Sequence, residues 1–389
     1  MSNDYVIRRL DSARDVDALA WDKLLSIQLK PTPFMCHAYL LALESSDSAC
    51  KRTGWSAKFF LVEREGELQG ACVLYIKMHS YGEYVFDWAW ANAYQSHGLD
   101  YYPKAVIAVP FTPVPGSRLL AIDQPTRQLL LVEVLTWCQS ESMSSLHILF
   151  TSPDDVDAGH ACGLLSRSTV QFHWSNATPP HQDFEQFLAT LSQDKRKKIK
   201  QERKKIAAAG ISFQTLVGRE ISSADWDFFY RCYTTTYKDH GSTPYLTRGF
   251  FEEMARHMPG QWLMFVARRV DRAIACSLIA LNTQGANGKQ TAYGRYWGAL
   301  ERVDCLHFEA CYYQPIAWCI DNQYQSFEGG AQGEHKMARA LMPTTTTSMH
   351  WIAHPAFSAA VSQFLDHEGL GINSYLSDLR ERSPFKSEI

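Results

Sequence analysis

The sequence predicts an α/β (α+β) protein made of two tandem domains, each a mixed sheet flanked by helices. Its 389 residues exceed what one ordinary core needs and suit two domains of roughly 150–200 residues each. The hydrophobic content of 46% can bury two sizeable cores, and it excludes disordered and collagen-like chains. Both halves also repeat one order of elements: helices, a hairpin, a strand, a helix and a strand.

The first half is expected to begin with a strand and two helices, followed by a hairpin that turns at Glu65-Gly66-Glu67. Glycine at the turn, between two runs rich in apolar residues, indicates antiparallel pairing of the flanking strands. A strand, a proline-containing turn, a helix and a last strand complete this half. The expected bounds are Tyr5–Leu10, Asp15–Ile27, His37–Leu43, Trp55–Arg64, Leu68–Lys77, Ala105–Val109, Arg127–Cys138 and Leu146–Thr151.

The crossover between the domains is placed after a strand at Thr169–Asn176, which Pro179 and Pro180 end. Residues 1–176 then form the N-terminal domain and residues 177–389 the C-terminal domain. The second domain begins with one long helix, Phe184–Ala209, which Gly210 stops. The other expected elements are Ile211–Val217, Asp225–Thr236, Arg248–His257, Trp262–Arg269, Ala273–Asn282, Thr291–Leu300, Phe308–Asn322, a strand from Phe327, a short strand His350–Ile352, and one or two helices in Pro355–Arg382.

Charge and cysteine usage restrict the class of protein. The formal net charge is -3, so polyanion binding would need a local basic patch. The ten cysteines are scattered without a C-x-x-C pair, which predicts reduced thiols and no metal site. The N-terminus lacks an apolar signal segment, and no apolar run is long enough to span a bilayer. These features predict a soluble, cytoplasmic protein.

The stretch Ser326–Met342, SFEGGAQGEHKMARALM, combines glycines with a carboxylate, an imidazole and an amine. Glycines let the backbone pass close to a ligand or to another segment. Glu334, His335 and Lys336 are consecutive, so they cannot all face one way; some would face a site and others support it. A turn with a solvated charge cluster is the alternative.

Two further segments stand out. The segment His79–Leu120 mixes aromatic rings with polar groups, and it forms either a wide aromatic core or the wall of a ligand pocket. We favour the pocket, because Glu83 and Asp87 lie among the rings and would be costly to bury unpaired. The most basic run of the chain lies in the long helix and includes Lys197, Lys198 and Lys204. It is either a solvated face or a surface for a nucleic acid, and the solvated face is the more common.

Several motifs carry a resemblance to a known family. They read HSYGEYVFDWAWANAYQSHGLDYYPK, VPFTPVPGSRLL, RKKIKQERKKIAAAGI, YGRYWGALERVDCLHFEACYY and EGGAQGEHKMARALMP. Together with the order of elements, they resemble the FemAB-like peptidoglycan biosynthesis or recognition proteins of the GNAT acyltransferase superfamily. The resemblance implies two tandem GNAT-like domains with largely antiparallel sheets, and transfer of an acyl or aminoacyl group to an amine.

The resemblance also implies a donor, which is acyl-CoA or an aminoacyl-tRNA. In acyl-CoA-using relatives a glycine-rich turn after the fourth strand holds the pyrophosphate, and Gly116, Ser117 and Arg118 occupy the matching place. The usual Q/R-x-x-G-x-G/A pattern is absent there, and the corresponding turn of the second half, Leu300–His307, has no glycine. In aminoacyl-tRNA-using relatives a basic helical arm approaches the tRNA, which gives the basic run a function.

Acyl transfer to an amine needs a base, a donor that faces the developing oxyanion, and desolvated positioning. We expect Glu334 or His335 to be the base, and Lys336, Arg295 and Tyr293 to hold a carboxylate or phosphate. The amino group of a small amine, amino-acid or peptide acceptor would be held by Glu83 and Asp87. The remaining expected substrate-binding residues are Trp90, Tyr94, Tyr102, Lys104, Trp297 and Gln332. A catalytically idle module that binds a cell-wall peptide and an RNA-binding protein are the alternatives.

Overall fold

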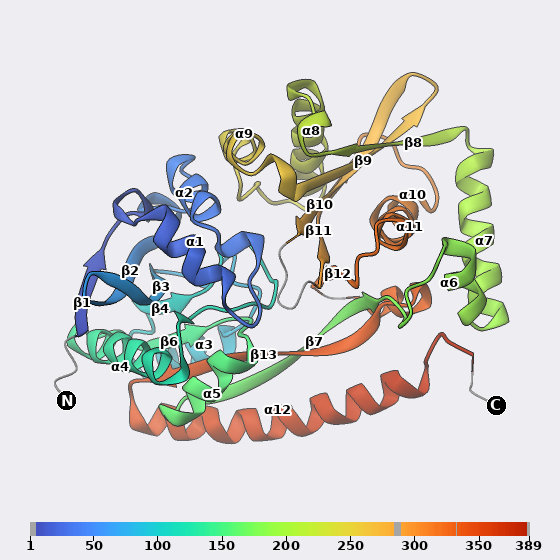
Figure 1. Cartoon of the computed structure of the whole chain (residues 1–389). Helices are drawn as coiled ribbons and strands as arrows, with labels where there is room; N and C mark the ends of the chain where they lie inside the picture. Colours follow the sequence, from blue (N-terminus) through green and yellow to red (C-terminus); the bar gives the residue numbers. More distant parts are fainter. Residues whose placement is uncertain (1–4, 284–288, 332, 387–389) are drawn as a thin grey trace. The chain divides into compact units, whose positions relative to one another are not determined.

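The structure is a computed structural model, and it describes residues 5–283, 289–331 and 333–386 (Figure 1). The chain forms two compact units. The first contains Met1–Thr169 and Thr345–Tyr375, and the second contains Val170–Thr344 and Leu376–Ile389. The chain therefore changes unit inside strand β7 (Leu165–Ser175), inside strand β13 (Met342–Ile352) and inside helix α12 (Pro355–Glu381). The sequence prediction had one boundary, after residue 176, and assigned 345–375 to the C-terminal domain.

The first unit contains a mixed sheet with the strand order β1-β2-β3-β4-β6-β13. Its neighbours pair antiparallel, except that β4 and β6 are parallel; the short β5 pairs with β3. Besides parts of β7, β13 and α12, the elements are β1 Tyr5–Leu10, η1 Ala13–Asp15, α1 Ala18–Ser26, η2 Pro33–Met35, α2 His37–Ser45, η3 Lys51–Thr53, β2 Ser56–Arg64, β3 Glu67–Lys77, α3 Trp88–Ser96, β4 Lys104–Ile107, β5 Leu120–Ala121, α4 Gln124–Ser140, β6 Ser145–Ile148 and α5 Pro153–Ala161.

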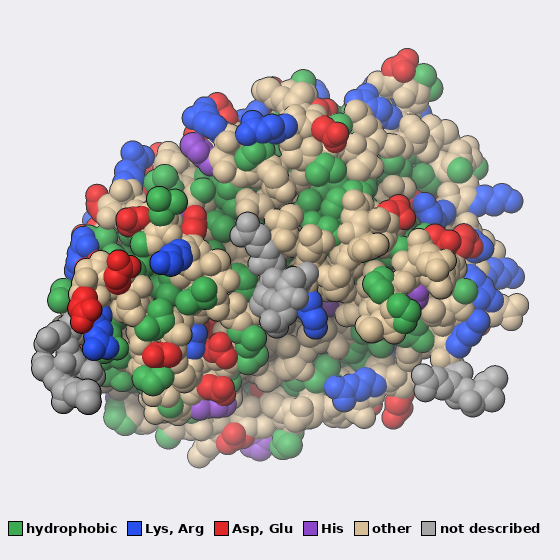
Figure 2. Space-filling view, in the orientation of Figure 1, with side chains coloured by type: hydrophobic (Ala, Val, Ile, Leu, Met, Phe, Trp, Pro, Cys, Tyr) green, Lys and Arg blue, Asp and Glu red, His purple; other side chains and the backbone are tan. Residues whose placement is uncertain are grey.

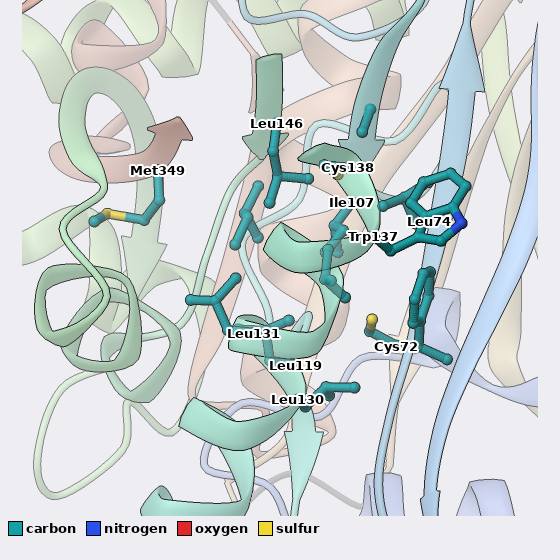
Figure 3. Close-up of a cluster of buried hydrophobic side chains, with 14 of the residues drawn as sticks. Cys72, Leu74, Ile107, Leu119, Leu130, Leu131, Trp137, Cys138, Leu146 and Met349 are labelled. Carbon is teal, nitrogen blue, oxygen red and sulfur yellow. The ribbon is translucent and has the colours of Figure 1, made fainter. Parts of the chain in front are cut away.

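Helices cover both faces of this sheet. Adjacent residues of a strand point to opposite faces, and in β2 the ring of Phe59 packs on Trp21 of α1 while the ring of Phe60 packs on Trp137 of α4. The core on the α4 side gathers aliphatic side chains of α4 and of the strands around Leu74 and Ile107 (Figure 3). This burial holds the ends of β3 and β4 that carry Lys77 and Lys104.

The second unit repeats the plan with the strand order β7-β12-β11-β10-β9-β8. Among the described residues, neighbouring strands in this order pair antiparallel, except that β11 and β12 are parallel. Its elements are α6 Phe184–Thr190, α7 Gln193–Ala208, β8 Ile211–Val217, η4 Gly218–Glu220, α8 Ser223–Asp239, α9 Arg248–His257, η5 Pro259–Gln261, β9 Trp262–Arg269, β10 Arg272–Asn282, β11 Thr291–Ala299, α10 Leu306–Phe308, the π-helical η7 Glu309–Tyr313, α11 Gln314–Asp321, β12 Ser326–Ala331 and η8 Glu334–Arg339.

The structure differs from the sequence prediction in several helices, among them α5, which was not expected. The predicted long helix Phe184–Ala209 is two helices, because Leu191 adopts an extended backbone, is fully buried and forms a β-bridge with Phe385. Residues Trp88–Ser96, for which no helix was expected, form α3. Trp90 and Tyr94 are its buried residues, and their spacing of four places both rings on one face.

Candidate functional site

The candidate site lies in the second unit, where β12 separates from its parallel neighbour β11. The two strands pair over three residues, Thr291–Tyr293 opposite Ser326–Glu328. The register of β12 with β7 then shifts across Gly329 and Gly330. Such bulges bend a strand and are frequent beside active sites.

Glycine is required at these positions for two different reasons. A Cβ atom on Gly329 would lie 2.4 Å from Cδ2 of Leu341, so close packing excludes a side chain there. Gly330 and Gly333 have φ angles of +80° and +113°, which residues with a side chain rarely adopt. The glycines therefore set the path of the chain into η8.

The turn η8 separates groups that face solvent from groups that anchor it. Glu334 and His335 are exposed, whereas Lys336 and Arg339 are buried. Glu334 forms an ion pair with Arg382 at 3.2 Å, and its side chain is 48% exposed. The expected base residues thus lie on the outer side of a turn whose inner side carries two cations.

His335 is the better placed base. Its Nε2 lies 3.1 Å from the hydroxyl of Tyr312, and its ring also contacts the rings of His307 and Phe308. Partial burial lowers the pKa of His335, and the cations of Lys336 and Arg339 lower it further. The imidazole is therefore neutral near pH 7 and can accept a proton.

Lys336 supplies a cation behind the imidazole. Its Nζ donates a hydrogen bond of 2.9 Å to the carbonyl oxygen of Gly330, so the bulge and the turn are tied together. Burial lowers the pKa of Lys336 to about 8. At neutral pH Lys336 remains mostly an ammonium, although its pKa lies only slightly above the pH.

Arg339 anchors the turn to the basic helix α7. Its Nη2 donates to both carboxylate oxygens of Glu202, at 2.9 and 3.1 Å, and Tyr313 donates to the same carboxylate. Its Nη1 donates to the carbonyl oxygen of His335 at 2.8 Å, and its guanidinium lies 3.5 Å from the centre of the Phe308 ring. A bidentate, buried pair of this kind fixes both partners, so the position of His335 depends on α7.

The π-helical turn η7 brings the aromatic partners together. Single π-helical turns inside helices are frequent at functional sites, because the extra residue displaces neighbouring side chains. Here the turn carries Tyr312 toward His335 and Tyr313 toward Glu202. It also buries Glu309, which accepts hydrogen bonds from Arg203 at 3.2 Å and Gln314 at 2.7 Å.

In the first unit, the expected acceptor-binding carboxylates already hold an amine. Nζ of Lys104 donates to Glu83 at 2.8 Å, to Ser80 at 2.7 Å and to Asp87. All three charged side chains are at most 4% exposed. The chemistry expected from the sequence, two carboxylates around an amino group, is present, but the amino group belongs to the protein itself.

The two carboxylates share one cation, but their pKa values are shifted in opposite directions. Burial raises the pKa of Glu83 to about 7. Burial would also raise that of Asp87, but Lys104 and His147 hold the Asp87 pKa below its usual value. Nearby, burial lowers the pKa of Lys77 to about 7. At neutral pH the proton shared within the cluster therefore resides on Glu83 in preference to Asp87.

The predicted aromatic residues of this segment surround the cluster. Tyr102 bonds to Ser80 at 2.9 Å between hydroxyl oxygens, and Trp90 packs edge-on against His350. Tyr94 packs against Tyr101 and, with ring centres 4.1 Å apart, against Phe357. All three thus contact residues of their own unit.

Gly116, Ser117 and Arg118, the expected cofactor-binding residues, are buried and their backbone amides are used within the protein. Gly116 donates to the carbonyl oxygen of Phe150 at 3.0 Å, and Ser117 to that of Lys30 at 2.9 Å. Arg118 donates to the carboxylate of Asp155 at 2.8 Å. A pyrophosphate would need these same donors, and a buried carboxylate of the chain already takes one of them.

The expected ligand-holding residues of β11 have different surroundings. Tyr293 is 2% exposed, and Trp297 packs against His307. Arg295 is the extra residue of a bulge, since Leu278 pairs with Tyr296 and the next residue, Ile279, pairs with Gly294. Gln332 lies outside the described residues.

The sequence matches the FemAB-like family, described as peptidoglycan biosynthesis/recognition, over residues 12–387. The chain belongs to the FemAB-like family. No curated protein matches the sequence.

Solved structures show the same fold at low identity. FemX is similar with a TM-score of 0.55 and 11% identity, covering 91% of this chain and 100% of that chain. L-PGS from Bacillus licheniformis gives 0.51 and 10%, covering 87% and 98%. The C-terminal domain of a putative lysylphosphatidylglycerol synthetase from Agrobacterium fabrum gives 0.50 and 9%, covering 92% and 97%. The likeness confirms the predicted fold class of this FemAB-like protein.

The basic run of this FemAB-like chain forms the outer face of α7. Lys197, Lys198 and Lys204 are all exposed, and Lys and Arg side chains gather over α7 at the right of Figure 2. The inner stripe of the helix consists of Ile199, Glu202 and Ile206. The helix thus combines a solvated basic face with a buried acidic contact to η8.

Several residues of the two clusters were not expected from the sequence, notably Glu202, Tyr312, Lys77, His147 and His350. Glu202 left a signal, because it is an acidic residue on the apolar stripe of an otherwise basic helix, three residues after Ile199. The two histidines left none: their Nδ1 atoms lie 2.8 Å apart across 203 residues of sequence.

The described ranges are 5–283, 289–331 and 333–386. There, no three or more His, Cys, Asp or Glu side chains group so as to hold a metal ion. None of the helices in those ranges has the length and apolar character to cross a membrane.

Proposed function

We propose that this FemAB-like protein transfers an acyl or aminoacyl group from an activated donor to the amine of a peptide or amino acid of the peptidoglycan type. The observation that carries the proposal is the arrangement on η8: the neutral, exposed imidazole of His335 lies 3.1 Å from the Tyr312 hydroxyl and beside the buried ammonium of Lys336. Membership of the family supplies the class of substrate.

The proposed chemistry combines proton transfers with one displacement. His335 takes a proton from the acceptor ammonium, and the free amine attacks the carbonyl carbon of the donor ester or thioester. The carbon–nitrogen bond forms, the carbon–oxygen or carbon–sulfur bond to the carrier breaks, and the imidazolium returns its proton to the leaving group, while the second proton of the attacking nitrogen is released to solvent. The ammonium of Lys336 favours negative charge that develops on the carbonyl oxygen.

Glu334 is the second candidate base. Its ion pair with Arg382 and its 48% exposed side chain place it in a solvated setting. A carboxylate that faces solvent beside an arginine is placed to hold a cationic group. We therefore assign the proton transfer to His335 and a role in holding the acceptor amine to Glu334.

For the donor, aminoacyl-tRNA is favoured over acyl-CoA by two observations. The amides of Gly116, Ser117 and Arg118 are used within the protein, whereas the exposed lysines of α7 form a basic face. A basic face of this kind attracts a phosphate backbone. The buried pair of Glu202 and Arg339 would connect that face with η8.

The experiment measures transfer from labelled aminoacyl-tRNA, and separately from acetyl-CoA, to a lysine-containing peptide. We expect the double variant Glu334→Gln, His335→Asn to lose turnover at least 100-fold, as for removal of a general base, while the thermal midpoint stays unchanged. His257→Asn, an exposed histidine of α9 in the same unit, is the matched control. Turnover that survives in the double variant contradicts the assignment. Binding of the peptide without turnover from either donor favours a recognition module.

A further inference from the structure

A cavity of about 300 Å³ lies in the second unit beside the bulge of β11, and its lining includes neither Glu334 nor His335. It lies between the C-terminal end of α8, the residues that follow it, and three consecutive residues of β11. Its lining is Tyr233, Thr236, Tyr237, His240, Ser242, Arg295, Tyr296 and Trp297. These eight residues include one permanent cation, four aromatic rings and no carboxylate.

The bulge explains why an arginine reaches this cavity. An extra residue in one strand of an antiparallel pair re-aims its side chain, and Arg295 is that residue in β11. Its guanidinium carbon lies 5.0 Å from the centre of the Tyr296 ring, and its Nη2 donates to the Tyr296 hydroxyl at the long distance of 3.3 Å. The cation is therefore held at the wall of the cavity by an aromatic neighbour.

Helix α8 is pressed against this part of β11. A Cβ atom on Gly298 would lie 2.1 Å from the carbonyl oxygen of Cys232, so only glycine permits the approach. Thr236 also donates to the carbonyl oxygen of Trp297 at 2.9 Å. The helix and the strand thus lie in close backbone contact beside the cavity.

Two parts of the cavity have opposite electrostatic preferences. Arg295 favours a carboxylate or phosphate. The C-terminal end of α8, at Tyr237 to His240, carries the negative end of the helix dipole and favours a cation. The rings of Tyr233 and Tyr237 next to it also attract an ammonium group. A small molecule with both charges would satisfy both ends at once.

We propose that this cavity binds a small zwitterion, an amino acid or a dipeptide with free ends, with its carboxylate on Arg295 and its ammonium toward the end of α8. The volume lies at the lower limit of small-molecule sites, which favours a ligand of this small size. The proposal rests on the proposed function in one respect: it makes the cavity a subsite for the amino-acid part of a substrate of the same unit.

The test is isothermal titration calorimetry on the full chain with four probes: alanyl-alanine, alanyl-alaninamide, N-acetyl-alanyl-alanine and inorganic phosphate. We expect alanyl-alanine to bind, and loss of either charge to weaken binding at least about tenfold, which corresponds to about 1.4 kcal/mol. Equal binding of the amide and the acid overturns the carboxylate contact. Binding of phosphate without binding of the dipeptide overturns the zwitterion site.

Variants assign the site to the cavity. Arg295→Gln should weaken alanyl-alanine binding at least about tenfold, and Arg295→Lys by less, because the charge remains but the bidentate geometry is lost. Tyr237→Phe keeps the ring and should change binding by less than about threefold. Arg302→Gln removes an exposed arginine that follows β11 and is the matched control. Wild-type affinity in Arg295→Gln overturns the proposal.

Failure of this proposal and failure of the proposed function are distinguishable. Binding of alanyl-alanine that depends on Arg295, in a protein without transferase turnover, retains the cavity as a site and overturns the proposed function. Turnover that depends on His335, with KM unchanged in Arg295→Gln, retains the function and overturns the cavity as its subsite.

Discussion

Each unit contains a cluster of buried charge, and the two clusters differ in what they leave accessible. In the first unit, Lys104, Glu83 and Asp87 are 0–4% exposed, so the cluster is enclosed by its own unit. In the second unit, the pair of Glu202 and Arg339 is nearly as buried. The turn that this pair anchors nevertheless exposes His335.

The backbone accounts for the difference. Around Lys104 the partners come from a loop, whose residues Ser80, Glu83 and Asp87 all converge on one amine. Beside Arg339 the chain passes through a glycine bulge and a tight turn, which direct successive side chains to opposite sides. The same residue types thus form a structural brace in one unit and a candidate site in the other.

The largest effect is expected from removing the brace. Lys104→Met leaves two carboxylates buried without their shared cation, which should lower the free energy of unfolding by about 3–5 kcal/mol. Urea unfolding measures the change. The triple variant Lys104→Met, Glu83→Gln, Asp87→Asn should recover most of it, because no charge then remains unpaired. A loss below about 1 kcal/mol in the single variant would mean that the cluster is hydrated and not enclosed.

A smaller stability effect and a larger effect on turnover are expected from Arg339→Met. The substitution removes a bidentate partner of Glu202 and should lower the free energy of unfolding by about 2 kcal/mol. Because Arg339 also holds the backbone of His335, turnover should fall at least about tenfold, equal to about 1.4 kcal/mol in the barrier. Arg302→Met is the control for loss of an arginine. Unchanged turnover would mean that Arg339 does not position His335 for the reaction.

The smallest effect concerns pH and compares two buried lysines, Lys77 and Lys336, whose pKa values are lowered. The pKa values of Lys77 and Lys336 are lowered to about 7 and about 8, whereas an unfolded lysine stays protonated to about pH 10. Between these folded-state pKa values and about pH 10, the unfolded chain binds more protons than the folded chain, so the free energy of unfolding rises with pH. Lys77→Met should lose part of this rise from about pH 7 upward, and Lys336→Met from about pH 8 upward.

Urea unfolding at about pH 7, 8 and 9.5 checks this comparison. The Lys336 variant should also lose turnover, whereas the Lys77 variant should keep it, since Lys77 belongs to the brace of the first unit. An unchanged slope of stability against pH in both variants would show that neither lysine titrates in this range.

Much of the fold could be predicted from the sequence, because the signals for it are local. The hairpin of β2 and β3 follows from a glycine turn between two runs of apolar residues, and the two strands pair antiparallel as predicted. The break at Leu191 could not be predicted, since it depends on a β-bridge to Phe385. Residues that are compatible with a helix lie on both sides of Leu191, so the sequence favoured one continuous helix.

The candidate site was predictable only in part. The glycine-rich stretch around Glu334 and His335 led to the hypothesis of a site there, because it combines glycines with a carboxylate and an imidazole. Its anchor was not visible, since Arg339 and Glu202 are 137 residues apart. The contacts of the turn at Gly116 were hidden for the same reason, since Asp155, which binds the amide of Arg118, lies 37 residues away.

The sequence by itself determined the FemAB-like family, the two-fold repeat of elements and the stretch that carries the candidate chemistry. These depend on residue types, periodicity and turns, which act over a few neighbouring residues. Only the tertiary structure decided which charges are buried against partners of the protein and which are left accessible. That choice depends on burial and on partners distant in the chain, because the energy of a charge is set by everything that surrounds it in space.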